Sequence, residues 1–312
     1  MLLHNQTQAI QRMNTLAKEG KDFFFIINYR ADSAYIEEFT NIDPRELLFS
    51  FPTLSNIPEA ESYSNEAVEW HTEPPTREDY EHRINLVKQR EREGDSYLAN
   101  LTCKIPIRTN LSLHDIFMRS KALYRCWLKE KFVCFSPEIF VRINREGLIS
   151  SFPMKGTIDA TRPDAEKELM ENKKEAAEHA TIVDLIRNDL SMIAEKVQVK
   201  RYRYVDHLTT NKGEILQTSS EITGQLSVDY RQNIGTLLFR LLPAGSITGA
   251  PKPRTMEIID EAEGYERGFY TGVMGCYSKG QLDSAVMIRF IDQDKDGQLH
   301  YKAGGGITAQ SN

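Results

Sequence analysis

The segment from Phe132 to Lys155 constrains the fold most strongly, because it reads as consecutive β-strands joined by short turns. Its sequence is FVCFSPEIFVRINREGLISSFPMK, interrupted at Ser136-Pro137 and at the turn from Asn144 to Gly147. Proline and Asn-Gly turns end strands, and short connections join antiparallel neighbours. Glu138 is therefore expected to open one strand and Lys155 to end the next, so that a hairpin brings both to one sheet edge.

Other regions of the chain also alternate strand and turn. Runs rich in apolar and β-branched residues predict strands within 23–29, 47–54, 96–102, 197–230 and 267–307. Two stretches have helical periodicity instead. One begins at an N-cap, Thr76, and stops at Gly94, and the other covers 173–190.

Composition favours a soluble globular protein of one domain, 1–312, with an N-terminal scaffold portion, 1–75, and a motif-bearing portion, 76–312. The 312 residues are 40 % hydrophobic, and we find no Gly/Ser-rich linker or internal repeat. A net charge of −6 argues against nucleic acid or an anionic membrane as the main partner. An anionic small molecule would need a local positive pocket.

Localisation is expected to be cytoplasmic. The N-terminus has no basic segment followed by an apolar core, and the run Phe23 to Ile27 is too short to span a bilayer. Four cysteines show neither zinc-ligand spacing nor a disulfide framework, so reduced thiols are the simplest interpretation.

Lys155 lies between an apolar Phe-Pro-Met run and a Gly-Thr turn. A lysine on an apolar shelf loses hydration, its pKa falls, and its amine becomes a nucleophile. The alternative is an ordinary surface turn. A carboxyl such as Glu138 beside it could serve as the acid.

Two charged residues lie in apolar surroundings and need partners. Glu178 shares a helical face with Ile182 and Leu185, so a cation or a metal should lie against it, and a structural salt bridge is the alternative. Arg289 lies within the run AVMIRF, which is costly unless it meets an anion. The backbone N–H groups of Gly304 to Gly306 would lie near that anion.

Two glycine-containing segments resemble ligand loops only superficially. The loop at 245–249 lacks the nucleotide-binding order, because Ala250 and Pro251 precede Lys252. It predicts either an anion site or a tightly packed corner. The DKDG segment at 294–297 lacks the other calcium ligands, so a hairpin turn is expected.

Taken together, the motifs resemble those of the chorismate-utilising enzymes, the family that includes anthranilate synthase, isochorismate and salicylate synthases and aminodeoxychorismate synthase component I. The matching segments are GDSYLANLT, SPEIF, PMKGT, EHATIVDLIRNDL, LLPAGSITGAPKPRTMEII, FYTGVMG, SAVMIRF and AGGGI, in family order from Gly94 to Ile307. The resemblance implies an α+β fold, in which large antiparallel sheets pack as a sandwich flanked by helices. It also implies chorismate as the substrate and Mg²⁺ as the cofactor.

Two positions sort the members of this family. Members that add water carry a lysine where this chain has Asn100, which cannot act as the base, so the resemblance implies ammonia as the nucleophile. Aminodeoxychorismate synthases carry a lysine at the position of Lys155, whereas anthranilate synthases usually have alanine there. Anthranilate synthases also have a histidine that we place at Thr236. The implied product is 4-amino-4-deoxychorismate, a precursor of p-aminobenzoate and folate, formed through a covalent bond to Lys155.

The resemblance assigns a role to each remaining candidate. Glu138 would be the general acid and Glu178 a magnesium ligand. The residues matched to the substrate pocket are Asn100, Gly156, Thr157, Tyr270, Arg289, Gly304 and Gly306. Ammonia would come from a separate glutamine amidotransferase subunit.

Several alternatives remain at this point. The family continues beyond the AGGGI motif with a helix that carries further metal-binding glutamates, whereas this sequence ends at Asn312. The protein could instead be anthranilate synthase component I or a non-catalytic chorismate-binding subunit. We find no segment like the tryptophan-binding L-L-E-S motif.

Overall fold

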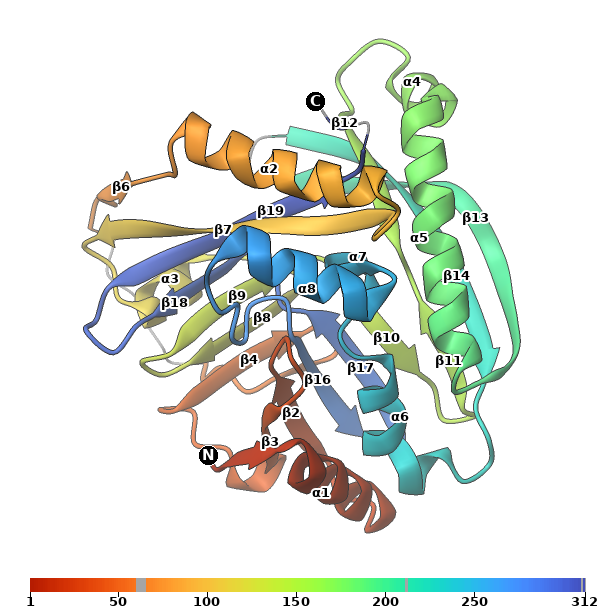
Figure 1. Ribbon diagram of the computed structural model, residues 1–312. Coiled ribbons are helices and arrows are strands. Elements are labelled where there is room, and N and C mark those ends of the chain that lie inside the picture. Colours follow the sequence, from red (N-terminus) through yellow and green to blue (C-terminus); the bar gives the residue numbers. More distant parts are fainter. Residues whose placement is uncertain (60–65, 211–212, 310, 312) are drawn as a thin grey trace.

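Two large antiparallel sheets dominate the computed structural model, which describes residues 1–59, 66–210, 213–309 and 311 (Figure 1). The first sheet has the order β1-β3-β2-β16-β17-β10-β11-β14-β12, and β13 pairs with β14. Its strands are β1 (Leu3–Asn5), β2 (Phe23–Ile27), β3 (Ser33–Glu38), β10 (Ile139–Ile143), β11 (Leu148–Ser151), β12 (Met154–Asp159), β13 (Glu195–Thr210), β14 (Gly213–Gln225), β16 (Val273–Ser278) and β17 (Gln281–Val286).

The second sheet has the order β15-β7-β19-β18-β9-β8-β4-β5, and β6 pairs with β7. Its strands are β4 (Leu47–Phe51), β5 (Leu54–Ser55), β6 (Trp70–Thr72), β7 (Leu98–Thr109), β8 (Tyr124–Leu128), β9 (Phe132–Ser136), β15 (Gly249–Ala250), β18 (Phe290–Gln293) and β19 (Leu299–Ile307). The segment 1–75 thus contributes strands to both sheets.

Helices cover the outer faces and edges of this sandwich. They are α1 (Gln6–Lys18), α2 (Arg77–Arg92), α3 (Leu113–Arg119), α4 (Ala165–Glu171), α5 (Lys173–Ser191), α6 (Ile234–Leu241), α7 (Gly245–Thr248) and α8 (Lys252–Glu263), with 3₁₀ turns at Phe39–Asn41 and Tyr230–Asn233. In Figure 1, α2 and α8 lie along β7 and β19, while α5 runs beside β13 and β14. Within the described residues no helix is both long and apolar enough to cross a membrane.

The core between the sheets is rich in aromatic side chains. Phe24 of the first sheet stacks on Phe49 of the second, with ring centroids 4.4 Å apart. Buried Cys126 and Met274 belong to the same cluster. Such close contact between side chains of both sheets holds them face to face. The α+β sandwich expected from the resemblance is therefore the observed fold.

Local sequence signals set several element boundaries correctly. The Thr76 side chain accepts a hydrogen bond from the Asp79 backbone N–H and caps α2, and Gly94 follows its end with a φ of +86°. The DKDG segment forms the hairpin turn between β18 and β19. At Gly249 an added Cβ would lie 1.8 Å from the Leu98 carbonyl oxygen, so this loop makes the tightly packed corner.

The expected hairpin ending at Lys155 is wrong in one respect. Strand β11 stops at Ser151, and Pro153 separates it from β12, because proline has no N–H to continue the ladder. Strand β12 then pairs with β14 and not with β11, so Lys155 lies within a new strand and not at the end of the previous one.

Candidate active site

Lys155 lies in an irregular part of β12. The pairing of β12 with β14 shifts register between Met154 and Thr157, and Gly156 has a φ of +86°, which favours glycine. The Thr218 hydroxyl donates a hydrogen bond to the Lys155 carbonyl. This bulge aims the Lys155 side chain at helix α5.

The Lys155 ammonium meets the Glu178 carboxylate of α5. Lys155 Nζ lies 2.8 Å from Glu178 Oε2, and the two side chains are 24 % and 14 % exposed. Lys174, one turn earlier on α5, lies 3.9 Å from the other Glu178 oxygen. Glu178 thus has the cationic partner that its apolar face required. The expectation of an apolar shelf beneath Lys155 is wrong, because a carboxylate receives its ammonium.

Strands β7 and β19 form the floor below this pair. Gly306 lies opposite Asn100, and Gly304 lies opposite Thr102. A Cβ built on Gly306 would be 3.2 Å from Lys155 Nζ, so the amine lies directly over the glycine backbone. The structure therefore brings Lys155, Glu178, Asn100 and Gly306 together from four separate elements.

Glu138 lies between β9 and β10 and contacts helix α7. The Ser246 hydroxyl donates a hydrogen bond to Glu138 Oε1. Burial raises the pKa of the Glu138 carboxyl, and the Ser246 hydrogen bond opposes this rise. A raised pKa suits a carboxyl that donates a proton.

Helix α5 contacts both the Lys155–Glu178 ion pair and the turn whose Ser246 hydroxyl meets Glu138. A Cβ built on Gly245, beside Ser246, would lie 2.8 Å from the Leu185 side chain. Leu185 follows Glu178 by two helical turns, which corresponds to about 10 Å along α5. The turn that carries Ser246 and the Lys155 amine therefore contact α5 at points about two turns apart.

Tyr270 and Arg289 differ in their relation to Phe290, since Tyr270 packs near its ring and Arg289 precedes it in the chain. Tyr270 is buried, and its ring centroid is 5.8 Å from that of Phe290. Arg289 is exposed because β17 ends at Val286 and the chain turns there with a φ of +53° at Arg289. The expected costly burial of this charge is therefore absent. None of the described residues forms an ion pair with Arg289, so its guanidinium remains open to an anion.

The contacts of three further positions from the sequence analysis are defined. Thr157 is exposed and accepts a 3.3 Å hydrogen bond from Gln217. Gly156 faces the Glu175 carboxylate, since an added Cβ would lie 3.2 Å from Glu175 Oε2. Thr236 bonds to Asn14 of α1, so it contributes to helix packing and carries no information about this site.

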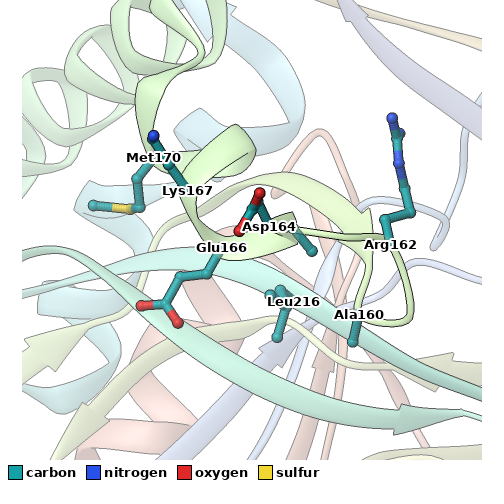
Figure 2. Close-up of a pocket in the computed structure, with 8 residues that line it drawn as sticks. Ala160, Arg162, Asp164, Glu166, Lys167, Met170 and Leu216 are labelled. Carbon is teal, nitrogen blue, oxygen red and sulfur yellow. The ribbon is translucent and has the colours of Figure 1, made fainter.

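A cavity of about 260 Å³ opens beside the lysine pair. It is lined by Tyr97, Leu98, Lys174, Ala177, Glu178, Thr181, Thr308 and Ala309. A larger hollow of about 590 Å³ lies around the start of α4, where Arg162, Lys167, Asp164 and Glu166 surround it (Figure 2). That hollow contains none of the predicted site residues, so the chemistry points to the smaller cavity.

The donor set beside Lys155 fits Mg²⁺ better than a transition metal. Glu178 and Glu175 lie one turn apart on α5 and both approach β12. Among the described residues no three His, Cys, Asp or Glu side chains cluster as a metal site. Magnesium commonly takes one or two carboxylates and completes its shell with water and substrate oxygens. Glu178 and Glu175 are the residues that would hold it.

Sequence analysis missed Glu175 and Ser246. The spacing of Glu175 to Glu178, one helical turn, was a usable signal for the first. Ser246 meets Glu138 across 108 positions of chain, and no local pattern encodes that contact.

Comparisons with known proteins show the family to which the chain belongs. The family model described as chorismate binding enzyme matches residues 18–312. An uncharacterized PabA-like protein of Haemophilus influenzae is 45 % identical over 308 residues, covering 97 % of this chain and 91 % of the relative. Anthranilate synthase component 1 of Acetivibrio thermocellus is 34 % identical over 258 residues, covering 76 % of this chain and 49 % of the relative.

A solved structure supports the fold. The crystal structure of a 2,3-dihydroxybenzoate-specific isochorismate synthase, DhbC, from Bacillus anthracis matches with a TM-score of 0.68 at 18 % identity, covering 100 % of this chain and 86 % of that one. The chain belongs to the chorismate-binding enzyme family. Its fold and its motifs are those of a chorismate-utilising enzyme.

Proposed function

We propose that the chain is an aminodeoxychorismate synthase component I, which converts chorismate and ammonia to 4-amino-4-deoxychorismate. The observation that carries the proposal is the position of the Lys155 amine, over the Gly306 backbone and 2.8 Å from Glu178. A nucleophilic amine is thereby held beside a group that can bind metal or substrate charge. The PabA-like name of the Haemophilus influenzae relative supports a role in p-aminobenzoate synthesis.

The reaction requires two balanced displacements. Lys155 attacks C2 of chorismate as the free amine, after its ammonium has released a proton to solvent; the ring double bonds shift, and the C4 hydroxyl takes a proton from Glu138 and leaves as water. Ammonia then attacks C4, the double bonds shift back, and the C2–N bond breaks with its electron pair returning to Lys155. The proton lost from the new C4 ammonium restores the acid form of Glu138. Asn100 lies in the floor of the site and has no basic group with which to activate water.

Charge on the substrate would be met by several groups. Arg289 has no ion-pair partner among the described residues, and Gly304 and Gly306 are exposed in β19. These groups would hold the substrate carboxylates. When bound, Mg²⁺ supplies positive charge that orients and neutralises a carboxylate, with Glu178 and Glu175 as its protein ligands.

Ammonia in this proposal comes from a separate glutamine amidotransferase subunit, and the reaction takes place in the cytoplasm. Excess ammonium salt replaces the partner in a purified assay. This replacement allows the synthase step to be tested on the chain alone.

The test is identification of the product by mass and chromatography after incubation with chorismate, Mg²⁺ and ammonium. We expect 4-amino-4-deoxychorismate, which an added lyase converts to p-aminobenzoate. Lys155→Ala should abolish this product and retain chorismate binding. Lys174→Ala is the matched control, because Lys174 also approaches Glu178 but is 55 % exposed. Equal turnover in Lys155→Ala and wild type would overturn the covalent step.

Anthranilate synthase component I is the second candidate, favoured by the 34 % identity to the Acetivibrio thermocellus enzyme. The same incubation distinguishes the two, because anthranilate is fluorescent and differs from aminodeoxychorismate in mass. Chorismate binding without any product would instead indicate a non-catalytic chorismate-binding subunit.

A further inference from the structure

Ser246 contacts the acid of the proposed reaction from a turn that is firmly held. Its hydroxyl donates to Glu138 Oε1, and the Glu138 backbone is fixed as well. The Glu138 N–H donates to Ser136 Oγ at 3.0 Å, and its carbonyl accepts from Val286 at 3.1 Å. The carboxyl therefore has one defined orientation, with Oε1 engaged and Oε2 free of hydrogen bonds from the described residues.

Two side chains that belong to ion pairs pack against helix α7, which carries Ser246. A Cβ built on Gly245 would lie 3.1 Å from Asp189 Oδ2, and the Asp189 carboxylate lies 2.7 Å from Lys252 Nζ. On the other side, Arg267 donates to the Ile247 carbonyl at 3.0 Å. These contacts fix the position of the turn, so the Ser246 hydroxyl meets Glu138 in a set geometry.

An oxygen that already accepts a hydrogen bond is less basic than its twin on the same carboxyl. We propose that Ser246 is a positioning residue that keeps the proton of Glu138 on Oε2 and so directs it at the leaving C4 hydroxyl. This inference rests on the proposed function, since it takes Glu138 as the general acid. It adds a residue that selects which oxygen carries the proton.

The charged groups on the elements around this contact are Asp189, which pairs with Lys252, Glu263, which pairs with Arg267, and the exposed Arg289. The pKa of Glu138 responds to burial, which raises it, and to Ser246, which lowers it. Removal of the hydroxyl therefore raises the pKa further. Because the acid works while protonated, the alkaline limb of the activity profile should move to higher pH.

The kinetic test compares Ser246→Ala with Ser246→Thr, measuring chorismate consumption against pH with Mg²⁺ and saturating ammonium. In Ser246→Ala we expect kcat to fall roughly 10-fold, since directed proton transfer contributes that much or more. KM should stay within about twofold, and the alkaline limb should rise by about one pH unit. Ser246→Thr retains a hydroxyl and should restore both values. Glu138→Gln identifies the limb that belongs to Glu138.

Ser227→Ala is the matched control for loss of a serine-to-carboxylate bond. Ser227 donates to Asp229 at 2.6 Å on the exposed surface, so its loss should leave the profile unchanged. An unmoved limb in Ser246→Ala, or equal damage in Ser246→Thr, would overturn the proposal.

Infrared difference spectra give a readout that needs no turnover. The spectrum of wild type minus Glu138→Gln at low pH contains the carbonyl stretch of protonated Glu138. The second spectrum is that of Ser246→Ala minus the double variant Ser246→Ala, Glu138→Gln. In it the band should lie at higher frequency, because Oε1 has lost its hydrogen-bond donor. An unchanged band refutes the role of Ser246, whereas a shifted band in a protein that consumes no chorismate refutes the proposed function alone.

Discussion

Two cation–carboxylate pairs lie along the ladder of β7 and β19, and they are satisfied to very different degrees. Arg267 and Glu263 are 2 % and 1 % exposed, whereas Lys155 and Glu178 are 24 % and 14 % exposed. The Arg267 guanidinium donates to Glu263 and also to acceptors at Asn100, Ile247 and Thr271. Its donors are therefore occupied.

Glu263 is equally well satisfied. It accepts from Arg267 and from both the backbone N–H and the hydroxyl of Thr102, at 2.7 and 2.8 Å. Glu178 has two lysines near it and, among the described residues, accepts no hydrogen bond from the backbone or a hydroxyl. Burial with complete hydrogen bonding marks a structural pair, while unused hydrogen-bonding capacity marks a pair that can exchange its partner for a ligand.

The largest expected effect separates these pairs by stability. Arg267→Met should lower the free energy of unfolding by about 3–5 kcal/mol, because it leaves Glu263 buried without its cation. Lys155→Met is the control and should change it by no more than about 1 kcal/mol, because its partner keeps access to water. Urea denaturation measures both. Equal losses of unfolding free energy in the two variants would contradict the difference between a structural pair and an exchangeable one.

Glu91 of α2 shows what burial does when no side chain among the described residues forms an ion pair with the carboxylate. Burial raises the carboxyl pKa to about 7 from 4.5, although the Ala99 backbone N–H and the Lys88 charge act to lower it. A raised folded-state pKa means that stability is full below about pH 4.5 and is lost as the pH rises through 7. Glu91→Gln should therefore stabilise the protein at pH 8.5 by about 2–3 kcal/mol and have little effect at pH 4.

Thermal or urea unfolding across pH 4 to 8.5 measures this difference. Glu93→Gln, on the exposed end of the same helix, is the control and should show no such trend. A gain from Glu91→Gln that is the same at every pH would show that the carboxyl is not titrating between the two states.

The glycines of β19 test how closely β19 and β7 approach each other between the Arg267–Glu263 and Lys155–Glu178 ion pairs. A Cβ on Gly304 would lie 2.4 Å from Thr102 Cγ2, whereas nothing lies within 4 Å of a Cβ on Gly305. Gly304→Ala should therefore cost about 1–3 kcal/mol through overpacking. Gly305→Ala should be close to neutral. Urea denaturation measures the stability of both variants. Equal stability would contradict the closer packing at Gly304.

The smallest effect concerns single hydroxyls. Thr102→Val keeps the shape but removes one donor from the buried Glu263, at a cost of about 1 kcal/mol. Thr157→Val removes a hydroxyl on the exposed side of β12 and should cost less than about 0.5 kcal/mol. A larger loss at Thr157 than at Thr102 would reverse the ranking of the two sites.

Local signals in the sequence predicted much of the framework. The cap at Thr76, the stop at Gly94, the buried strand from Phe23 to Ile27 and the helix around Glu178 all follow from short-range patterns. The resemblance to the family added the sandwich and the order of the motifs. Both depend on residues close together in the chain or on motif order.

Contacts between distant segments could not be read in this way. Asn100 and Gly306 pair across more than 200 positions, and Ser246 reaches Glu138 from helix α7. Arg289 looked buried because its neighbours are apolar, but the strand ends before it and the chain turns outward. Pairing register and strand ends depend on tertiary packing, which sequence periodicity does not report.

The bulge at Gly156 separates the side chain at position 155 from the pairing pattern of β12. Because the irregular backbone detaches position 155 from the regular alternation of β12, the identity of that side chain is not fixed by the sheet. An exchange there changes the group that faces Glu178, whereas the hydrogen bond from the Thr218 hydroxyl is accepted by the main-chain carbonyl of residue 155 and does not depend on its side chain. A change of side chain at position 155 therefore leaves the pairing of β12 with β14 in place.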